Sequence, residues 1–243
     1  MKPLLIINFK TYENGTGSKA LKIAKIIDSI ARHEKDVEII IAVQHTDIRM
    51  ISNAVSIPVF AQHVDGISYG SNTGFTLPEA VKEAGARGTI INHSEHQLRI
   101  DEIERAVNRS KAVGLTTVVC AIDPKISESV AALEPDFVAV EPPELIGGKV
   151  SVCQAKPEII ENSIACVNKV NANIPVLCGA GVHTRDDAKK AIELGAVGVL
   201  VASGIVKARD AKKATLELVS GLKEGMEIAN STDEYMYYKV KEG

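Results

Sequence analysis

The sequence predicts a single-domain (β/α)8 barrel, and three observations support that prediction. Short apolar runs recur every few tens of residues, and a helix-like stretch follows each of the eight runs. The run at residues 137–140 shows no polar alternation, which is typical of a parallel strand covered on both faces. No linker rich in Pro, Gly or Ser divides the 243 residues. Strand-helix alternation at this length indicates a barrel, with an open doubly wound sheet as the alternative.

The expected strands are short and spread along the whole chain, at residues 4–7, 37–43, 59–61, 89–91, 117–121, 137–140, 176–178 and 197–202. Helical patterns cover 21–31, 101–113 and 184–194, and a glycine follows each of the last two. Thr76 and Glu79 have the spacing of a capping box. Two prolines leave room only for a short helix around 127–133. We expect the barrel to occupy 1–224 and a C-terminal extension of no assigned role to follow at 225–243.

Composition narrows the possible partners to small molecules. Hydrophobic residues make up 45% and charged residues 24%, with a formal net charge of -3 and no basic run for nucleic acid. No window reaches the roughly 18 apolar residues of a membrane span. The N-terminal apolar stretch is too short for a secretory signal, so we expect a cytoplasmic protein with no membrane partner. The four cysteines at 120, 153, 166 and 178 show no paired spacing, and we expect them to be reduced.

Polar residues follow five of the expected strands, where the active site of a barrel forms; strands two and three end in Gln44-His45 and Gln62-His63, and the other three carry the candidate catalytic residues. Strand one ends in Asn8-Phe9-Lys10, strand four runs into an Asn-His-Ser-Glu sequence that contains His93 and Glu95, and strand six ends at Glu141. Each alone could be an ordinary rim lysine, strand-end cap, buried histidine or surface acid. Together they place a base, a donor and a cation around one cavity. That set suits removal of a proton next to a carbonyl, which creates an oxyanion.

Strands seven and eight end instead in small residues, Gly179-Ala180-Gly181 and Ala202-Ser203-Gly204. Small residues let a ligand approach backbone N–H groups, and the loops after these two strands form the usual phosphate site of such barrels. The sequence therefore favours a phosphorylated small molecule as the ligand.

The segment after Glu141 has the composition of a lid. Pro142-Pro143 restricts the backbone next to the acid, and Gly147-Gly148 frees it a few residues later. We expect the residues between them to move as a unit and to close over the bound phosphate.

The motifs Asn8-x-Lys10, Asn92-His93-Ser94-Glu95, Ala139-Val140-Glu141-Pro142 and Ile146-Gly147 occur in this order over nearly the whole chain. In this the sequence resembles triosephosphate isomerase, in its compact archaeal form. The resemblance implies an isomerase that interconverts dihydroxyacetone phosphate and D-glyceraldehyde 3-phosphate in glycolysis and gluconeogenesis. It implies no cofactor and no metal.

The resemblance also implies a role for each motif residue. Glu141 would move a proton between two carbons, and His93 would be the neutral electrophile that polarises the carbonyl. Lys10 would supply positive charge to the enediolate, and Asn8 would orient that cluster; both would also bind substrate. Glu95 matches the family's second acid, although a residue at a helix start would equally serve as a cap. The expected phosphate contacts come from Gly147, Gly179, Ala180, Gly181, Ser203 and Gly204.

The chain departs from better-known bacterial and eukaryotic members of this family. It has no tryptophan, and Cys178-Gly179-Ala180-Gly181 stands where those members have a Tyr-Gly-Gly-Ser turn. Lid closure must therefore use other contacts, such as backbone groups around 180–182. The short fifth helix is a feature of the archaeal branch and implies a homotetramer built as a dimer of dimers. Thr73 matches the third-loop residue that reaches a neighbour's site.

Three other functions fit parts of the pattern. His45, His63, His93 and His183 could surround the mouth of a metal-dependent sugar-phosphate epimerase, but the expected acids are missing. Asp47 and Asp65 follow two of these histidines in loops, where capping is the expected role. A Schiff-base aldolase would carry a lysine in place of the acid that ends strand six. A catalytically silent sugar-phosphate sensor would not need the base, donor and cation.

Overall fold

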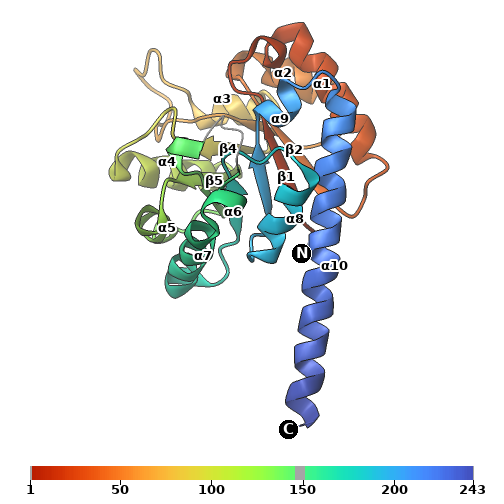
Figure 1. The fold of residues 1–243 in the computed structure, drawn as a ribbon. Coiled ribbons are helices and arrows are strands. Elements are labelled where there is room, and N and C mark those ends of the chain that lie inside the picture. The colour runs from red at the N-terminus through yellow and green to blue at the C-terminus, as the bar shows by residue number, and fades with distance from the viewer. Residues whose placement is uncertain (1, 146–150, 243) are drawn as a thin grey trace.

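The computed structural model describes residues 2–145 and 151–242, with side chains described as far as residue 231. Eight parallel strands hydrogen-bond in sequence order and close into one barrel, as predicted (Figure 1). The strands are β1 Leu4–Asn8, β2 Glu38–Val43, β3 Val59–Ala61, β4 Gly88–Ile91, β5 Thr116–Ala121, β6 Phe137–Val140, β7 Val176–Gly179 and β8 Gly198–Val201. Closure joins β1 to β8 in the register Leu4 to Gly198 through Ile7 to Val201, so no strand edge is left open.

Helices surround the barrel. They are α1 Gly17–Ala31, α2 Ile48–Ser52, α3 Pro78–Glu83, α4 Ile100–Ala112, α5 Pro124–Ala131, α6 Val152–Ala155, α7 Pro157–Asn171, α8 Arg185–Glu193, α9 Ser203–Val206 and α10 Ala211–Glu242. In the described part of the chain, the short 3-10 turns η1 Glu13–Gly15, η2 His45–Asp47 and η3 Pro143–Leu145 follow strands β1, β2 and β6.

The apolar core has two layers because side chains alternate across each strand. One layer fills the barrel with residues such as Leu4, Ile6 and Leu177. The other lies between strands and helices and contains Leu5 and Ile7. The polar residues at the ends of β1 and β6 continue the series of side chains that face the barrel interior. Because side chains alternate along each strand, these polar residues also face inward, at the mouth of the barrel.

Three helix starts differ from the sequence prediction. Helix α1 begins at Gly17, four residues before the predicted range of 21–31. The capping box at Thr76 and Glu79 is wrong, because Leu77 precedes α3 without a side-chain cap. Asp65 Oδ2 instead accepts from the Thr76 N–H at 2.6 Å, and the Glu79 carboxylate pairs with a guanidinium from α4. Helix α5 begins at Pro124, earlier than expected, because the Asp123 side chain caps it by accepting from the N–H of Ile126, the third residue of the helix.

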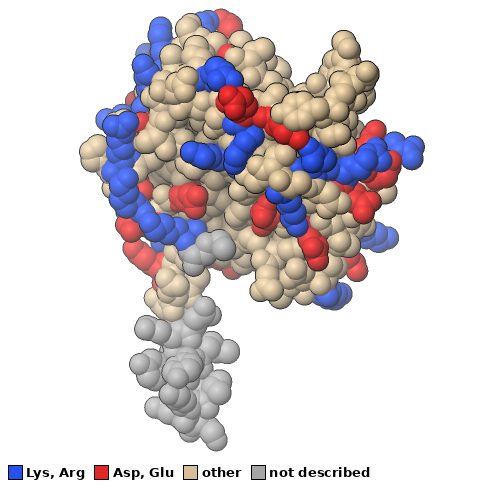
Figure 2. Space-filling view, turned by 180° about the vertical axis from the view of Figure 1, so that it is seen from behind, with Lys and Arg blue, Asp and Glu red and all other residues tan. Residues whose placement is uncertain are grey.

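Helix α10 packs beside α1 and α8 and then continues beyond the barrel, as the long blue helix in Figure 1 shows. It runs unbroken through the predicted boundary at residue 225, so the extension continues the last barrel helix. None of the helices in the described part of the chain is long and apolar enough to cross a membrane. On the face shown in Figure 2, positive and negative side chains are mixed.

Candidate active site

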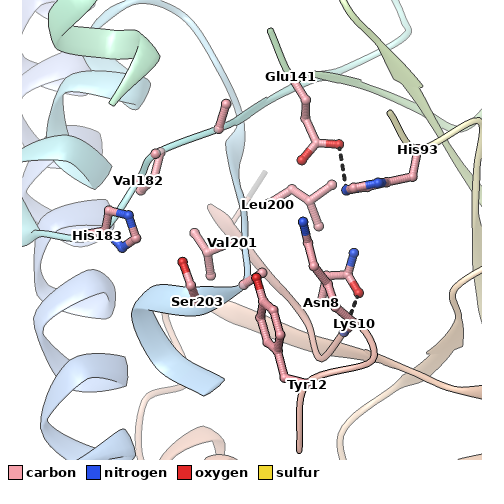
Figure 3. Close-up of a pocket in the computed structure, with 13 residues that line it drawn as sticks. Asn8, Lys10, Tyr12, His93, Glu141, Val182, His183, Leu200, Val201 and Ser203 are labelled. Atoms are coloured by element: carbon pink, nitrogen blue, oxygen red, sulfur yellow. Dashed lines mark hydrogen bonds and ion pairs between the residues drawn. The ribbon is translucent and has the colours of Figure 1, made fainter. Parts of the chain in front are cut away.

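A cavity with about 390 Å³ of empty space opens at the C-terminal ends of the strands (Figure 3). It brings together most of the predicted site residues, from the ends of five strands, β1, β4, β6, β7 and β8. The predicted residues that line it are Asn8, Lys10, His93, Glu141, Ala180, Gly181 and Ser203. The same wall includes Tyr12, Val182, His183, Leu200, Val201 and Ala202. Of these, Val182 was expected as a lid contact, His183 as a mouth histidine and Ala202 as a small residue at the end of strand eight, whereas Tyr12, Leu200 and Val201 were not predicted.

Glu141 and His93 face each other across this cavity. Glu141 Oε2 lies 3.4 Å from His93 Nε2, and both side chains are less than a tenth exposed. Neither atom makes a hydrogen bond to any residue that the structure describes. A buried polar atom without a hydrogen bond is costly, and such atoms are typical of sites that bind a polar ligand. The pair is therefore arranged to contact a substrate from two sides.

The hydrogen bond to Nδ1 of His93 determines which of its two ring nitrogens carries the proton. Nδ1 accepts a hydrogen bond from the Glu95 backbone N–H at 3.1 Å. A nitrogen that accepts an N–H carries no proton, so the neutral ring holds its proton on Nε2, the atom that faces Glu141. The backbone thus fixes the tautomer that can donate into the cavity.

Lys10 sits in the left-handed backbone region, with φ of 47°. The Asn8 side chain stabilises this turn because its Oδ1 accepts from the Lys10 N–H at 3.0 Å. The Lys10 side chain is 9% exposed, and its ammonium nitrogen lies 2.8 Å from Glu95 Oε1. Glu95 therefore acts as a partner of the lysine. The reading of Glu95 as a helix-start cap is wrong, since α4 begins only at Ile100. Gln62 donates to the carbonyl of the same turn at 3.1 Å.

Gly179 has a different environment from the one the sequence suggested. An ideal Cβ at this position would lie 2.4 Å from Glu141 Cγ, and its φ is not in the left-handed region. The glycine is therefore required for space, and the space is occupied by the stem of the acid. Cys120 lies close to the same carboxylate from inside the barrel. Burial, followed by the charge of Glu141, raises the pKa of that thiol well above its ordinary value.

The turn after β7 forms one wall of the cavity. Ala180 and Gly181 both have positive φ, 68° and 71°. The Ala180 carbonyl accepts from the Val152 N–H at the start of α6, at 3.2 Å. Asp187 in α8 supports the neighbouring segments. Its carboxylate accepts from the Ser151 hydroxyl at 2.7 Å and from two backbone N–H groups at the end of the turn.

The remaining two predicted phosphate contacts are not among the described residues that line the cavity. Gly204 does not line this cavity among the residues described, and a Cβ there would meet His183 Nδ1 at 2.8 Å. Gly147, with Gly148, lies outside the described residues. Tyr12, which the sequence analysis missed, stands beneath the Lys207 ammonium, 4.0 Å from the ring centroid. The signal in the sequence that could have identified Tyr12 is its position two residues after Lys10, in the same strand-end loop.

The mouth histidines form a separate group. His45, His63 and His96 line a neighbouring hollow, and the His63 and His96 ring centroids are 4.4 Å apart. Burial lowers the pKa of His63, although Asp65 at 3.2 Å acts in the opposite direction. Among the residues described, no three His, Cys, Asp or Glu side chains converge on a common metal position. The geometry expected of the epimerase alternative is not formed by these residues.

The two loop aspartates of that alternative serve local structure. Asp47 Oδ2 accepts from the Gly17 N–H at the start of α1, at 2.8 Å. Asp65 holds the Thr76 N–H, as described above. Asp47 therefore caps α1, as predicted, whereas Asp65 stabilises the loop before α3 and caps no helix in the described part of the chain.

The family profile described as triosephosphate isomerase matches residues 3–220. A relative with that name from Methanothermus fervidus is 48% identical over 219 residues, which are 90% of this chain and 98% of the relative. The relative from Methanobacterium bryantii is 50% identical over 218 residues, 90% of this chain and 96% of its own. A third, from Methanocaldococcus jannaschii, is 47% identical over 216 residues, 89% and 98% of the two chains.

The fold is similar to a crystal structure of triosephosphate isomerase from Bartonella henselae, with a TM-score of 0.71, and 92% and 99% of the two chains covered. At 18% identity this likeness supports the fold alone. The profile and the three relatives, by contrast, extend over almost the entire barrel sequence. They confirm the resemblance drawn from the strand-end motifs: the chain belongs to the triosephosphate isomerase family of enzymes.

Proposed function

We propose that this chain interconverts dihydroxyacetone phosphate and D-glyceraldehyde 3-phosphate through an enediolate, with Glu141 as the base and His93 as the electrophile. The family match and the names of the relatives support the reaction. The observation that carries the assignment of roles is the buried Glu141–His93 pair, 3.4 Å apart, in which the histidine proton faces the cavity. A base and a donor on opposite sides of one substrate are what proton transfer next to a carbonyl requires.

In the first step the Glu141 carboxylate removes a proton from the carbon beside the carbonyl. The C–H electron pair becomes the carbon-carbon double bond, and the carbonyl oxygen takes the negative charge. His93 Nε2–H donates to that oxygen, and the Lys10 ammonium offsets its charge. The protonated Glu141 then gives the proton to the neighbouring carbon, which regenerates the carboxylate. At the same time the hydroxyl proton moves from the oxygen of the first carbon to the former carbonyl oxygen, so the first oxygen becomes the new carbonyl and the second a hydroxyl.

We propose that the substrate phosphate lies against the small residues after β7 and β8. Ala180 and Gly181 present backbone there, and the Ser203 hydroxyl and Lys10 line the same cavity. Binding energy from this remote group would hold the reacting carbons between Glu141 and His93. The expected contact of Gly147 would add to this site, whereas Gly204 does not line the cavity and instead leaves space for the neighbouring His183.

Gly179 has another role in this proposal. It accommodates the stem of Glu141, because a side chain at 179 would collide with Glu141 Cγ. Its contribution is therefore to the position of the base and only indirectly to phosphate binding.

A coupled isomerase assay with the purified protein tests the proposal. We expect turnover of both triose phosphates before and after exhaustive chelation. Glu141→Gln, purified in parallel, is the matched control for a contaminating isomerase. Turnover that disappears on chelation and returns with a divalent transition metal would contradict the proposal and favour an epimerase-type site. Binding of triose phosphate without turnover would identify a silent sensor.

We further propose that the protein acts in the cytoplasm as a homotetramer, a dimer of dimers. The loop at residues 66–76 supports self-association because it carries no charged residue and exposes Tyr69 and Phe75, at 77% and 60%. Large exposed aromatic side chains on an uncharged projection are typical of a contact surface. Thr73 in the same loop is exposed and available to a neighbouring subunit.

A further inference from the structure

We propose that Cys153 and Cys178 are a redox-modification site that closes to an intramolecular disulfide on exchange with a small disulfide. Their Sγ atoms are 2.9 Å apart, while both residues are present as free thiols. A disulfide bond is about 2.0 Å long, so the two sulfurs need to approach by only about 0.9 Å. The chain positions 153 and 178 are far apart in sequence, so this proximity is produced by the fold.

The two cysteines lie on elements of unequal rigidity. Cys178 is in β7 and belongs to the layer between strands and helices, so its side chain points away from the barrel interior. Strand β7 is hydrogen-bonded to β6 and β8 on its two sides. Cys153 is in α6, which has only four residues. The small approach of the sulfurs is therefore taken up by α6, while the barrel strand stays in place.

A hollow at the surface gives small molecules a route to this pair. It contains about 850 Å³ of empty space, open to solvent, between α6 and α8. Cys153, Gln154 and Pro157 line one side, and Asp186, Lys189 and Glu193 line the other. Cys178 does not line it, and its contact with Cys153, followed by burial, raises the pKa of the Cys178 thiol. Cys153 borders the hollow but is only 1% exposed, so displacement of the short helix α6 is needed before an external disulfide reaches it, and Cys153 is then the first of the two to be reached.

The exchange proceeds in two balanced steps. The Cys153 thiolate attacks one sulfur of the external disulfide, forms a mixed disulfide and releases one thiol. The Cys178 thiolate then attacks Cys153 Sγ, forms the Cys153–Cys178 bond and releases the second thiol. The external disulfide is reduced to two thiols, which take up the two protons, and the protein loses two hydrogens.

The other two cysteines cannot take the same role. Cys120 belongs to the layer inside the barrel, on the opposite side of the sheet from Cys178. Cys166 lies on α7, partly exposed, and has no cysteine contact among the described residues. Cys166 therefore provides a matched control.

The site lies directly behind the active-site wall. The residue before Cys153 donates its N–H to the Ala180 carbonyl at 3.2 Å, and the residue after Cys178 is Gly179, which contacts Glu141. A bond between the cysteines would fix α6 to this wall. We expect it to lower isomerase turnover, an expectation that rests on the proposed function.

The experiment treats the folded protein with oxidised glutathione, quenches free thiols with acid and an alkylating agent, and counts them after unfolding. We expect the wild type and Cys166→Ser each to lose two thiols, and Cys153→Ser and Cys178→Ser to form no protein disulfide. Combined digestion after Lys, Arg and Glu puts Cys153, Cys166 and Cys178 on separate peptides. Mass spectrometry should find the first and third peptides joined. Retention of all four thiols, or a bond that includes Cys166 or Cys120, would overturn the proposal.

Turnover is measured on the same samples. The oxidised wild type should lose at least about half of its kcat and regain it with dithiothreitol, while Cys153→Ser keeps its kcat under oxidation. Unchanged turnover in a fully cross-linked sample would overturn the catalytic consequence. The thiol count and the peptide masses do not depend on turnover, so a protein that lacks isomerase activity would still report whether the bond forms.

Discussion

His93 Nε2 lies 3.4 Å from Glu141 Oε2, and the described part of the chain offers neither atom a hydrogen bond. Folding has buried a carboxylate and an imidazole N–H that face each other, at a cost in stability, because buried polar atoms are normally paired. The backbone N–H of Glu95 on Nδ1 keeps the imidazole in one tautomer. The fold thus holds a proton acceptor and a proton donor at the positions where a substrate needs them.

Backbone strain is concentrated around the same pair. Lys10, Asn92 and Ala180 are three of the four non-glycine residues with positive φ in the described chain, and they follow β1, β4 and β7. Each makes a hydrogen bond that helps to hold its conformation. The Lys10 N–H donates to the Asn8 side chain, the Asn92 side chain donates to the Cys120 carbonyl, and the Ala180 carbonyl accepts from the Val152 N–H. Strained residues that gather at one site are typical of functional positions.

The first prediction separates the catalytic histidine and lysine from the mouth histidines. His93→Ala and Lys10→Met should each lower kcat/KM by a factor on the order of 10² or more, because each removes a preorganised group that stabilises developing charge. His45→Ala and His63→Ala are the controls and should change kcat/KM much less, since neither residue lines the active-site cavity. Steady-state kinetics that show equal losses at all four positions would contradict the assigned roles.

The second prediction concerns the space above Gly179. Gly179→Ala places a Cβ against Glu141 Cγ and should lower kcat at least about tenfold with little change in KM, because the base is displaced and the phosphate contacts remain. In a Glu141→Ala background the same substitution should have almost no further effect on the residual rate. A full additional loss in that background would show that Gly179 acts on the substrate and does not act through Glu141.

The third prediction concerns Asp187, which joins Ser151, α8 and the turn after β7. Burial acts to raise the pKa of Asp187, but hydrogen bonds from Ser151 and from the His183 and Thr184 N–H groups outweigh it, and the pKa lies below the ordinary value of 3.8. A folded-state pKa below the unfolded value stabilises the protein above about pH 4, and this contribution is lost as the pH falls through the folded pKa.

Asp187→Asn should therefore lower Tm at pH 7 by about 5 °C or more, and the difference from the wild type should narrow below about pH 4. Asp186→Asn, which alters the adjacent exposed residue, should leave Tm nearly unchanged. Thermal unfolding followed by circular dichroism between pH 3 and 7 measures both variants. A difference that widens on acidification would contradict the sign of this argument.

The fourth prediction concerns assembly. The uncharged projection that Figure 2 shows at its upper right corresponds to the loop at residues 66–76, whose aromatic side chains we expect to lie in a subunit interface. Light scattering at micromolar concentration should report a tetramer for the wild type and a smaller species for Phe75→Ser. A monomeric or dimeric wild type would contradict the tetramer and leave the chemistry unaffected.

Much of the fold could be predicted from the sequence because buried strands and their polar ends alternate along the chain. The strand boundaries agree within a residue or two, and the ends of β1, β4 and β6 identified Lys10, His93 and Glu141. Contacts between distant elements could not be predicted. The space that Gly179 provides for Glu141 and the pairing of Glu95 with Lys10 depend on how strands meet in the closed barrel. The same is true of Glu79, whose arginine partner on α4 replaced the predicted capping box.

The most direct test of the account is the rate of Glu141→Gln in the coupled isomerase assay, measured with folded protein whose Tm is close to that of the wild type. Glutamine keeps the shape of the side chain and its packing against Gly179 but cannot accept the proton from carbon. We predict that kcat falls by a factor of about 10² to 10⁴, as expected for removal of a general base, with KM changed little. A variant that retains kcat within tenfold of the wild type would contradict the role of Glu141 as the base.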